Sequence, residues 1–180
     1  MDNIVRNSST THLAEGEQTG SSASSYDGDL GTYWSVYYWE RSNGNKNVNH
    51  YLTHTFSSPQ TIKKLAWKMT VAANCWAGAS YNGAGAGVWI ELYYGGSWNT
   101  IMGESGQGQG NWSWGYSQNG SYVENTNSGA GWQNVEKVRI RIWSYVERRD
   151  EGAGGGNEEA YGYTYELEAW AERGGFATII

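Results

Sequence analysis

The turn that begins at Asp27 is the first segment whose residue types could do chemistry. Asp27-Gly28-Asp29 is followed by Thr32, which places two carboxylates and a hydroxyl within one turn. Calcium takes about six to eight oxygen ligands from such groups on tight loops, so this spacing predicts a structural calcium site. The alternative is that Asp27 and Asp29 cap the turn through hydrogen bonds to the backbone.

Sugar binding is the second chemistry that the residues indicate. Sugars present flat C–H faces between hydroxyls, so a site for them needs aromatic rings flanked by amide, His or Arg groups. The candidates for such a ligand-binding site are Tyr37, Trp39, Arg41, His50, Trp76, Tyr81, Trp112, Trp114 and Tyr116. In residues 111–116 the alternation would point two Trp rings the same way. The alternative is a strand whose Trp residues pack on the core.

Catalysis has little support in the sequence. No Ser stands in a G-x-S-x-G turn, and Cys75 has no identifiable base. The carboxylates of residues 147–160 lie in a Gly-rich, charged stretch, where we expect them to be solvated with ordinary pKa values. His50 and His54 share one face of an extended segment, with one expected on the surface and the other in the core. The chain is therefore predicted not to be an enzyme.

The elements that must position these residues are strands. Period-2 alternation marks residues 50–56, 62–71, 87–94, 135–147 and 160–170. In the last segment Tyr161, Tyr163 and Tyr165 share a predicted face with Leu167. Helix signals are nearly absent. The Gly-, Asn- and Ser-rich segments 72–87, 103–134 and 147–160 are predicted to be long loops that carry aromatic residues.

Composition and charge exclude several classes of function. The chain holds 26 Gly, 11 Trp and 14 Tyr but only 2 Phe, and rings with polar tips favour ligand platforms and interfaces. The net charge of −6, with no basic run, argues against nucleic acid as a partner. No apolar run approaches the roughly 18 residues of a membrane span. The single cysteine, Cys75, excludes an intramolecular disulfide.

Four segments in order resemble the discoidin-like (F5/8 type C) family of galactose-binding-like carbohydrate-binding modules. Residues 25–34 resemble its N-terminal signature, in which a small residue precedes Asp-Gly-Asp, Thr and Trp. Residues 51–69, residues 89–101, and the pair 138–145 and 165–170 are similar to the strands that follow. The sequence departs from the family at Thr55, which replaces the Asp of its Asp-Leu-Gly turn, and no Cys pair joins the termini.

The resemblance implies a fold, a metal and a ligand. The fold is an all-β, antiparallel jelly-roll sandwich over residues 20–172, with a polar N-terminal arm at 1–19 and a C-terminal tail at 173–180. A Glu from the last strand, here Glu166, would complete the calcium site with Asp27, Asp29 and Thr32. The function would be non-catalytic, lectin-like binding of a glycan or cell-surface carbohydrate.

A self-assembling structural subunit is the alternative function. Long aromatic loops could bury against further copies of the chain, because Trp and Tyr are favoured at interfaces. A phage or virion decoration or fibre protein, or an extracellular filament, would fit. Both functions place the protein outside the cell or on a virion surface. The expected partners are a glycan or further copies of the chain, without nucleic acid and without a membrane span.

Overall fold

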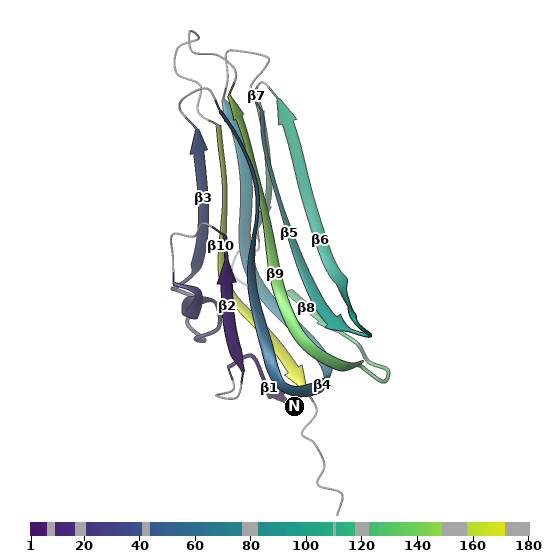
Figure 1. Ribbon diagram of the computed structural model, residues 1–180. Coiled ribbons are helices and arrows are strands. Elements are labelled where there is room, and N and C mark those ends of the chain that lie inside the picture. Colours follow the sequence, from purple (N-terminus) through teal and green to yellow (C-terminus); the bar gives the residue numbers. More distant parts are fainter. Residues whose placement is uncertain are drawn as a thin grey trace, which may run out of the picture.

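A computed structural model describes residues 1–6, 10–16, 21–40, 44–76, 83–109, 111–117, 123–148 and 158–171. Over these residues the chain is antiparallel β-structure with one short 3-10 turn at Ser22–Ser25. The strands are β1 (Asp2–Asn3), β2 (Thr11–Glu15), β3 (Trp34–Glu40), β4 (Gly44–Trp76), β5 (Gly83–Tyr94), β6 (Ser97–Gln109), β7 (Asn111–Ser117), β8 (Val123–Thr126), β9 (Trp132–Arg148) and β10 (Glu158–Ala171). The long strands run side by side along the molecule (Figure 1).

Strand β4 belongs to both layers of the sandwich. Residues 44–55 pair with β9, and residues 62–75 pair with β10, with register shifts between the two parts. The β9 sheet has the order β2-β4-β9-β5-β6. In the β10 sheet, β1 and β3 pair with one side of β10 and β4 with the other, and β7 and β8 follow β4. The predicted all-β, jelly-roll sandwich is confirmed.

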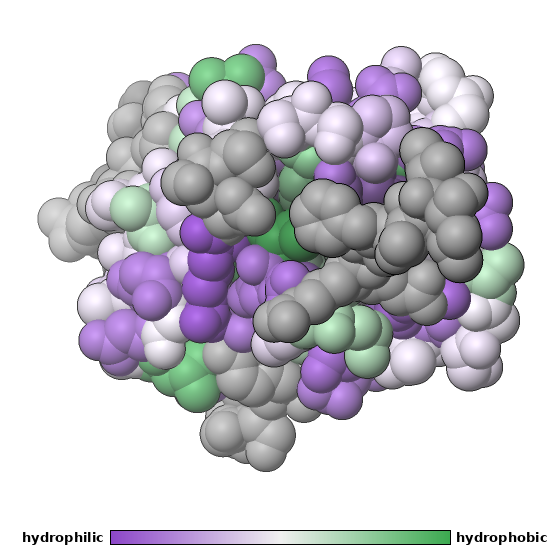
Figure 2. All heavy atoms as spheres, turned by 90° about the horizontal axis from the view of Figure 1, so that it is seen from below, coloured by the Kyte–Doolittle hydropathy of each residue, from purple (hydrophilic) through white to green (hydrophobic). Residues whose placement is uncertain are grey.

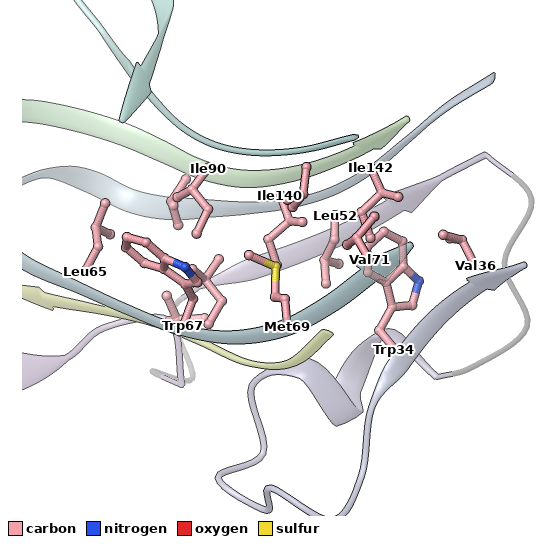
Figure 3. Packing of buried hydrophobic residues seen from close by; sticks show 14 of the residues in the cluster. Trp34, Val36, Leu52, Leu65, Trp67, Met69, Val71, Ile90, Ile140 and Ile142 are labelled. Carbon is pink, nitrogen blue, oxygen red and sulfur yellow. The ribbon is translucent and has the colours of Figure 1, made fainter. Parts of the chain in front are cut away.

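The core lies between the two sheets. Leu52, Ile90, Ile140 and Ile142 of the β9 sheet point toward Leu65, Trp67, Met69, Val71 and Trp34 of the β10 sheet (Figure 3). All of these side chains are at most 2% exposed. The five predicted strand segments all lie in strands, because burial of one face between two sheets requires the alternation that they show.

The predicted faces of the last segment are wrong. Ala160 and Thr164 are fully buried, whereas Tyr161, Tyr163 and Tyr165 point outward. A register shift between Thr164 and Glu166 marks a β-bulge, and beyond it Leu167 faces the core. A bulge changes the alternation, so Leu167 does not share the face of the tyrosines.

The predicted loops are wrong over much of their length. β4 extends to Trp76, β6 continues to Gln109, and β7 and β8 both fall within residues 103–134. Glycines in these strands lie against indole rings: a Cβ on Gly106 would overlap Trp114, and one on Gly108 would overlap Trp112. Glycine in a strand permits such close approach, so here it marks ring packing and not a loop.

The N-terminal region is part of the sandwich. β1 pairs with β10 and β2 pairs with β4, although both strands lie in the stretch predicted to be a polar arm. Ile4 and Val5 between them are buried in the core. The end of the molecule where the chain starts is mostly hydrophilic over its coloured surface (Figure 2). The predicted tail at 173–180 lies outside the described residues.

Candidate functional site

Strand ends meet at one end of the sandwich, which we call the loop end (Figure 1). There Glu158 pairs with both Glu40 and Cys75, Trp76 with Asn111, Gly83 with both Gln109 and Glu147, and Gly44 with Arg148. Antiparallel pairing therefore gathers the ends of β3, β4, β6 and β9 with the starts of β4, β5, β7 and β10 at one end of the molecule. Loops held together on a rigid scaffold are a common place for a binding site.

Several of the predicted ligand-binding positions reach the loop end. Trp39 pairs with Glu159, Trp112 pairs with Cys75, and Trp76 is the last residue of β4. The three backbone positions come from different parts of the sequence, and only strand pairing brings them together. Arg41 and Tyr81 lie outside the described residues, in the connections that follow β3 and β4.

The aromatic residues of β7 face inward. Trp112, Trp114 and Tyr116 are half-buried and pack against the core, with the indoles of Trp112 and Trp114 over Gly108 and Gly106 of β6. The hydroxyl of Tyr116 accepts a hydrogen bond from Trp67 Nε1 at 3.0 Å. The structure therefore supports the alternative interpretation, a strand whose Trp residues pack on the core. These rings contribute to packing between the sheets and are not exposed for stacking on a ligand.

Tyr37 points outward from the β10 sheet and is 41% exposed. Its hydroxyl donates to Glu159 at 3.2 Å, and Asn74 Nδ2 donates to the same carboxylate at 2.8 Å. Burial raises the pKa of Tyr37, and the negative charge of Glu159 acts in the same direction. The sequence interpretation missed Asn74 and Glu159 because it placed both in loops; continued alternation beyond Val71 could have indicated them.

Two predictions about histidine are wrong, because His50 and His54 are both fully buried. They share the inner face of β4 with Leu52, so His50 is not accessible to an external ligand. His54 Nδ1 lies 2.6 Å from His12 Nδ1, and the His12 ring stacks on Tyr26 at 3.9 Å. Burial lowers the pKa of His54 to about 3, with the nearby His12 acting in the same direction, so the ring stays neutral.

The turn at Asp27 is closed by its own hydrogen bonds. Asp27 accepts the N–H of Asp29 and the hydroxyl of Thr32, both at 2.8 Å. Asp29 in turn accepts the N–H of Gly31 at 2.8 Å. These contacts are the turn-capping alternative to a metal site.

Glu166 lies beside this turn, where the discoidin-like resemblance predicts it. One of its oxygens accepts the N–H of Gly28 at 2.8 Å, and the other lies 3.2 Å from the Arg6 guanidinium. Arg6 also pairs with Glu168 at 2.7 Å. Burial raises the pKa of Glu166, and both the N–H of Gly28 and Arg6 oppose that shift.

The oxygen atoms of Asp27, Asp29, Thr32 and Glu166 do not form a set of ligands that fits a calcium ion. Calcium requires several oxygens that converge on one point. Here the Glu166 carboxylate faces a guanidinium, and the carboxylates of Asp27 and Asp29 face N–H and O–H donors. In the part of the chain that the structure describes, no group of three or more His, Cys, Asp or Glu side chains could hold a metal.

Comparison with known proteins gives structural similarities only. No family model and no curated protein matches the chain. Among solved structures, it is similar to the family 32 carbohydrate-binding module (CBM) of C. perfringens NanJ in complex with galactose, with 14% identity, a TM-score of 0.40 and coverage of 92% of this chain and 96% of that one. It is also similar to the CBM32 of AlyQ in complex with 4,5-unsaturated mannuronic acid (17% identity, TM-score 0.38, 89% and 93% covered).

A third similar structure is CBM32-3 from a family 31 glycoside hydrolase of Clostridium perfringens, with 15% identity, a TM-score of 0.39 and 92% of each chain covered. The three structures cover 89% to 92% of this chain. The described residues contain no helix with the length and apolarity needed to cross a membrane.

Proposed function

We propose that this chain is a carbohydrate-binding module that recognises a glycan at its loop end. The supporting observation is the strand register that gathers Trp39, Trp76 and the start of β7 at one end of a rigid sandwich. Aromatic positions gathered at one rigid edge of a sandwich are suited to the flat faces of sugars. The proposed ligand implies a place outside the cell or on a virion surface.

We propose that the module binds without catalysis. Contrary to the sequence expectation, Glu147 and Glu158 are buried. They nevertheless belong to different sheets and to different kinds of face. Glu147 lies on the outer face of the β9 sheet, as Tyr145 does, whereas Glu158 lies on the inner face of the β10 sheet, as Ala160 does. General acid–base hydrolysis of a glycoside needs two carboxyl groups that flank one bond, which these two strand positions do not provide.

We also propose that Arg6 takes the place of the predicted calcium. Its guanidinium lies against Gly28 and joins the N-terminal segment to Glu166 and Glu168 of the last strand. A fixed cation from the chain itself thereby ties the N-terminal segment to the last strand, the role expected of the ion.

Titration of sugars against loop-end variants tests the carbohydrate proposal. Galactose and alginate oligosaccharides are the first probes, since the compared modules carry galactose and a mannuronic acid, and a glycan array extends the search. We expect Trp39→Ala, Trp76→Ala or Tyr81→Ala to weaken binding at least about tenfold, equivalent to about 1.4 kcal/mol.

Trp98→Ala is the matched control, because Trp98 lies near the β5–β6 turn, at the other end of β6 from the loop end. It should leave the affinity unchanged. Binding that survives all three loop-end substitutions would place the site elsewhere, and a properly folded protein that binds no glycan on the array would refute the proposal.

A further inference from the structure

Five tyrosines form a continuous surface on the outside of the β10 sheet. This tyrosine face comprises Tyr33, Tyr37, Tyr161, Tyr163 and Tyr165. The side chains of Tyr33 and Tyr37 are 44% and 41% exposed, the highest exposed fractions of any aromatic side chains among the described residues. The ring centroids of neighbouring tyrosines lie 5.0 to 6.4 Å apart, so the rings follow one another across β3 and β10.

A strip of small side chains lies beside these rings. Tyr161 pairs with Ala72, and Tyr163 pairs with Thr70, both on β4. The same two β4 residues pair with Gly115 and Ser117 of β7. Residues paired across strands share a face, so this strip continues the tyrosine face. Its small side chains project less far from the sheet than the tyrosine rings do. The result is a row of rings next to a shallow floor that carries hydroxyl groups.

The charges on this face are already engaged within it. Glu159 accepts from Tyr37 and Asn74, and the Lys68 ammonium lies 5.0 Å from the Tyr165 ring centroid. Burial raises the pKa of Tyr163, and its tyrosine neighbours and Glu159 act in the same direction. The Tyr163 phenol, like that of Tyr37, therefore remains a protonated hydrogen-bond donor at neutral pH.

The outer face of the β9 sheet also carries aromatic rings, and the chain's own cations lie over those of Tyr51, Trp89, Tyr93 and Trp98, while Trp143 and Tyr145 stack on each other. The Arg141 guanidinium lies 3.8 Å from the Trp89 ring centroid, and Arg139 lies 3.9 Å from that of Trp98. Arg139 in turn pairs with the buried Glu91 at 2.7 Å. A stacking ligand would have to displace these cation–π contacts, whereas among the described residues Lys68 is the one cation that lies over a ring of the tyrosine face.

The chemistry of the tyrosine face selects a neutral, hydroxyl-rich ligand. Described outer positions of the β10 sheet hold no Leu, Ile, Val, Met or Phe, although buried centres of protein interfaces are rich in apolar side chains. An anionic polymer would need free cations, which these positions do not offer. Sugar C–H faces can stack on the tyrosine rings, and sugar hydroxyls can pair with the phenols and with Thr70, Asn74 and Ser117.

We propose that the tyrosine face binds an extended, neutral polysaccharide along β3 and β10, as a second site distinct from the loop end. This inference takes from the proposed function only the class of ligand, a carbohydrate; the position of the site is argued independently of the loop end. Rings spread over two strands contact a chain of sugars at several points, so the face contributes to the binding of polymers and little to that of single sugars.

Native gel electrophoresis through gels that contain a neutral polysaccharide tests this inference. The probes are galactan, galactomannan, xylan and mixed-linkage glucan, with alginate as the anionic comparison. We expect at least one neutral polymer to retard the protein. The double substitution Tyr33→Ala/Tyr163→Ala should weaken that retardation at least about tenfold. The matched control Tyr51→Ala/Tyr93→Ala removes two tyrosines from the outer face of the β9 sheet and should leave retardation intact.

The outcomes separate this site from the loop end. If Trp39→Ala/Trp76→Ala abolishes binding of small sugars while retardation by polymer still depends on Tyr33 and Tyr163, both proposals hold. If small sugars do not bind at all but that dependence remains, only the loop-end proposal fails. Unchanged retardation of a folded Tyr33→Ala/Tyr163→Ala variant overturns the inference, as does no retardation by any neutral polymer. A dimer in light scattering that this double variant dissolves also overturns it, in favour of a second copy as the occupant.

Discussion

At the scale of single residues, Arg6 makes the contacts that the sequence assigned to a metal. The Glu166 side chain is fully buried, so it requires a partner for its charge, and Arg6 and the Gly28 N–H supply one. Removing one member of such a pair leaves a buried charge uncompensated.

Arg6→Met should therefore destabilise the fold. We expect a loss of about 1–3 kcal/mol in the free energy of unfolding, measured with urea, reduced from the fully buried case because Arg6 is partly exposed to solvent. Lys64→Met is the control, since its pair with Glu124 is on the surface, and it should change stability by less than about 0.5 kcal/mol. Millimolar calcium or a chelator should leave the melting temperature of the parent protein unchanged. A clear rise of the melting temperature with calcium would contradict this proposal and support a calcium site.

His54 makes stability depend on pH. Its pKa is about 3 in the folded chain and near the ordinary 6.5 when unfolded. Between pH 6.5 and pH 3, His54 is protonated in the unfolded chain but stays neutral in the folded chain, so protonation favours unfolding. The contribution to stability is complete above pH 6.5 and falls as the pH drops toward 3.

His54→Leu tests this dependence. We expect the parent protein to lose up to about 1.4 kcal/mol per pH unit through His54 within that window, and the variant to lose that part of the slope. Urea unfolding at several pH values measures both slopes. Parallel slopes in the two proteins would show that His54 takes up its proton in the folded state as easily as in the unfolded chain.

At the scale of elements, glycine and tryptophan together shape the strands of the loop end. Gly106 and Gly108 leave room on β6 for the indoles of Trp114 and Trp112 on β7, which comes from the other sheet. The two sheets therefore approach closely where large rings lie between them.

Gly106→Ala should disturb this packing. The new Cβ overlaps the Trp114 ring, which is held in the sandwich, so we expect a loss of about 1–3 kcal/mol measured by urea unfolding. Gly115→Ala on β7 is the control, because its Cβ would make an ordinary contact with Ala72 at 3.6 Å. That change should be neutral or slightly stabilising. Equal losses in both variants would point to backbone effects of alanine rather than ring packing.

At the scale of the whole molecule, the N-terminal residues join the two sheets. β1 pairs with β10, β2 pairs with β4 in the β9 sheet, and Val5 between them is fully buried. The segment predicted to be a polar arm thus contributes to the core.

Val5→Ala should lower the free energy of unfolding by about 1–3 kcal/mol, because it removes buried methyl groups. The control is Leu13→Ala in β2, where the side chain is 58% exposed and the effect should stay within about 0.5 kcal/mol. Thermal and urea unfolding measure both. A negligible effect of Val5→Ala would mean that the N-terminal segment is not docked in solution.

The sequence pattern was sufficient to predict the fold class and the alternating segments of β4, β5, β9 and β10. Alternation in segments such as 62–71 and 135–147 is imposed by burial of one face, which is a local property of each strand. The resemblance at residues 25–34 likewise placed Glu166 beside the turn at Asp27, and the structure brings them together.

The burial of each aromatic residue and the cation that faces Glu166 depend on contacts between distant parts of the chain. The bulge after Thr164 turned the tyrosines outward, and packing against glycines turned Trp112 and Trp114 inward. Arg6 meets Glu166 across 160 positions of sequence, which no local pattern encodes. Side-chain direction in a strand follows from its register with neighbours, and register is a property of the assembled sheet.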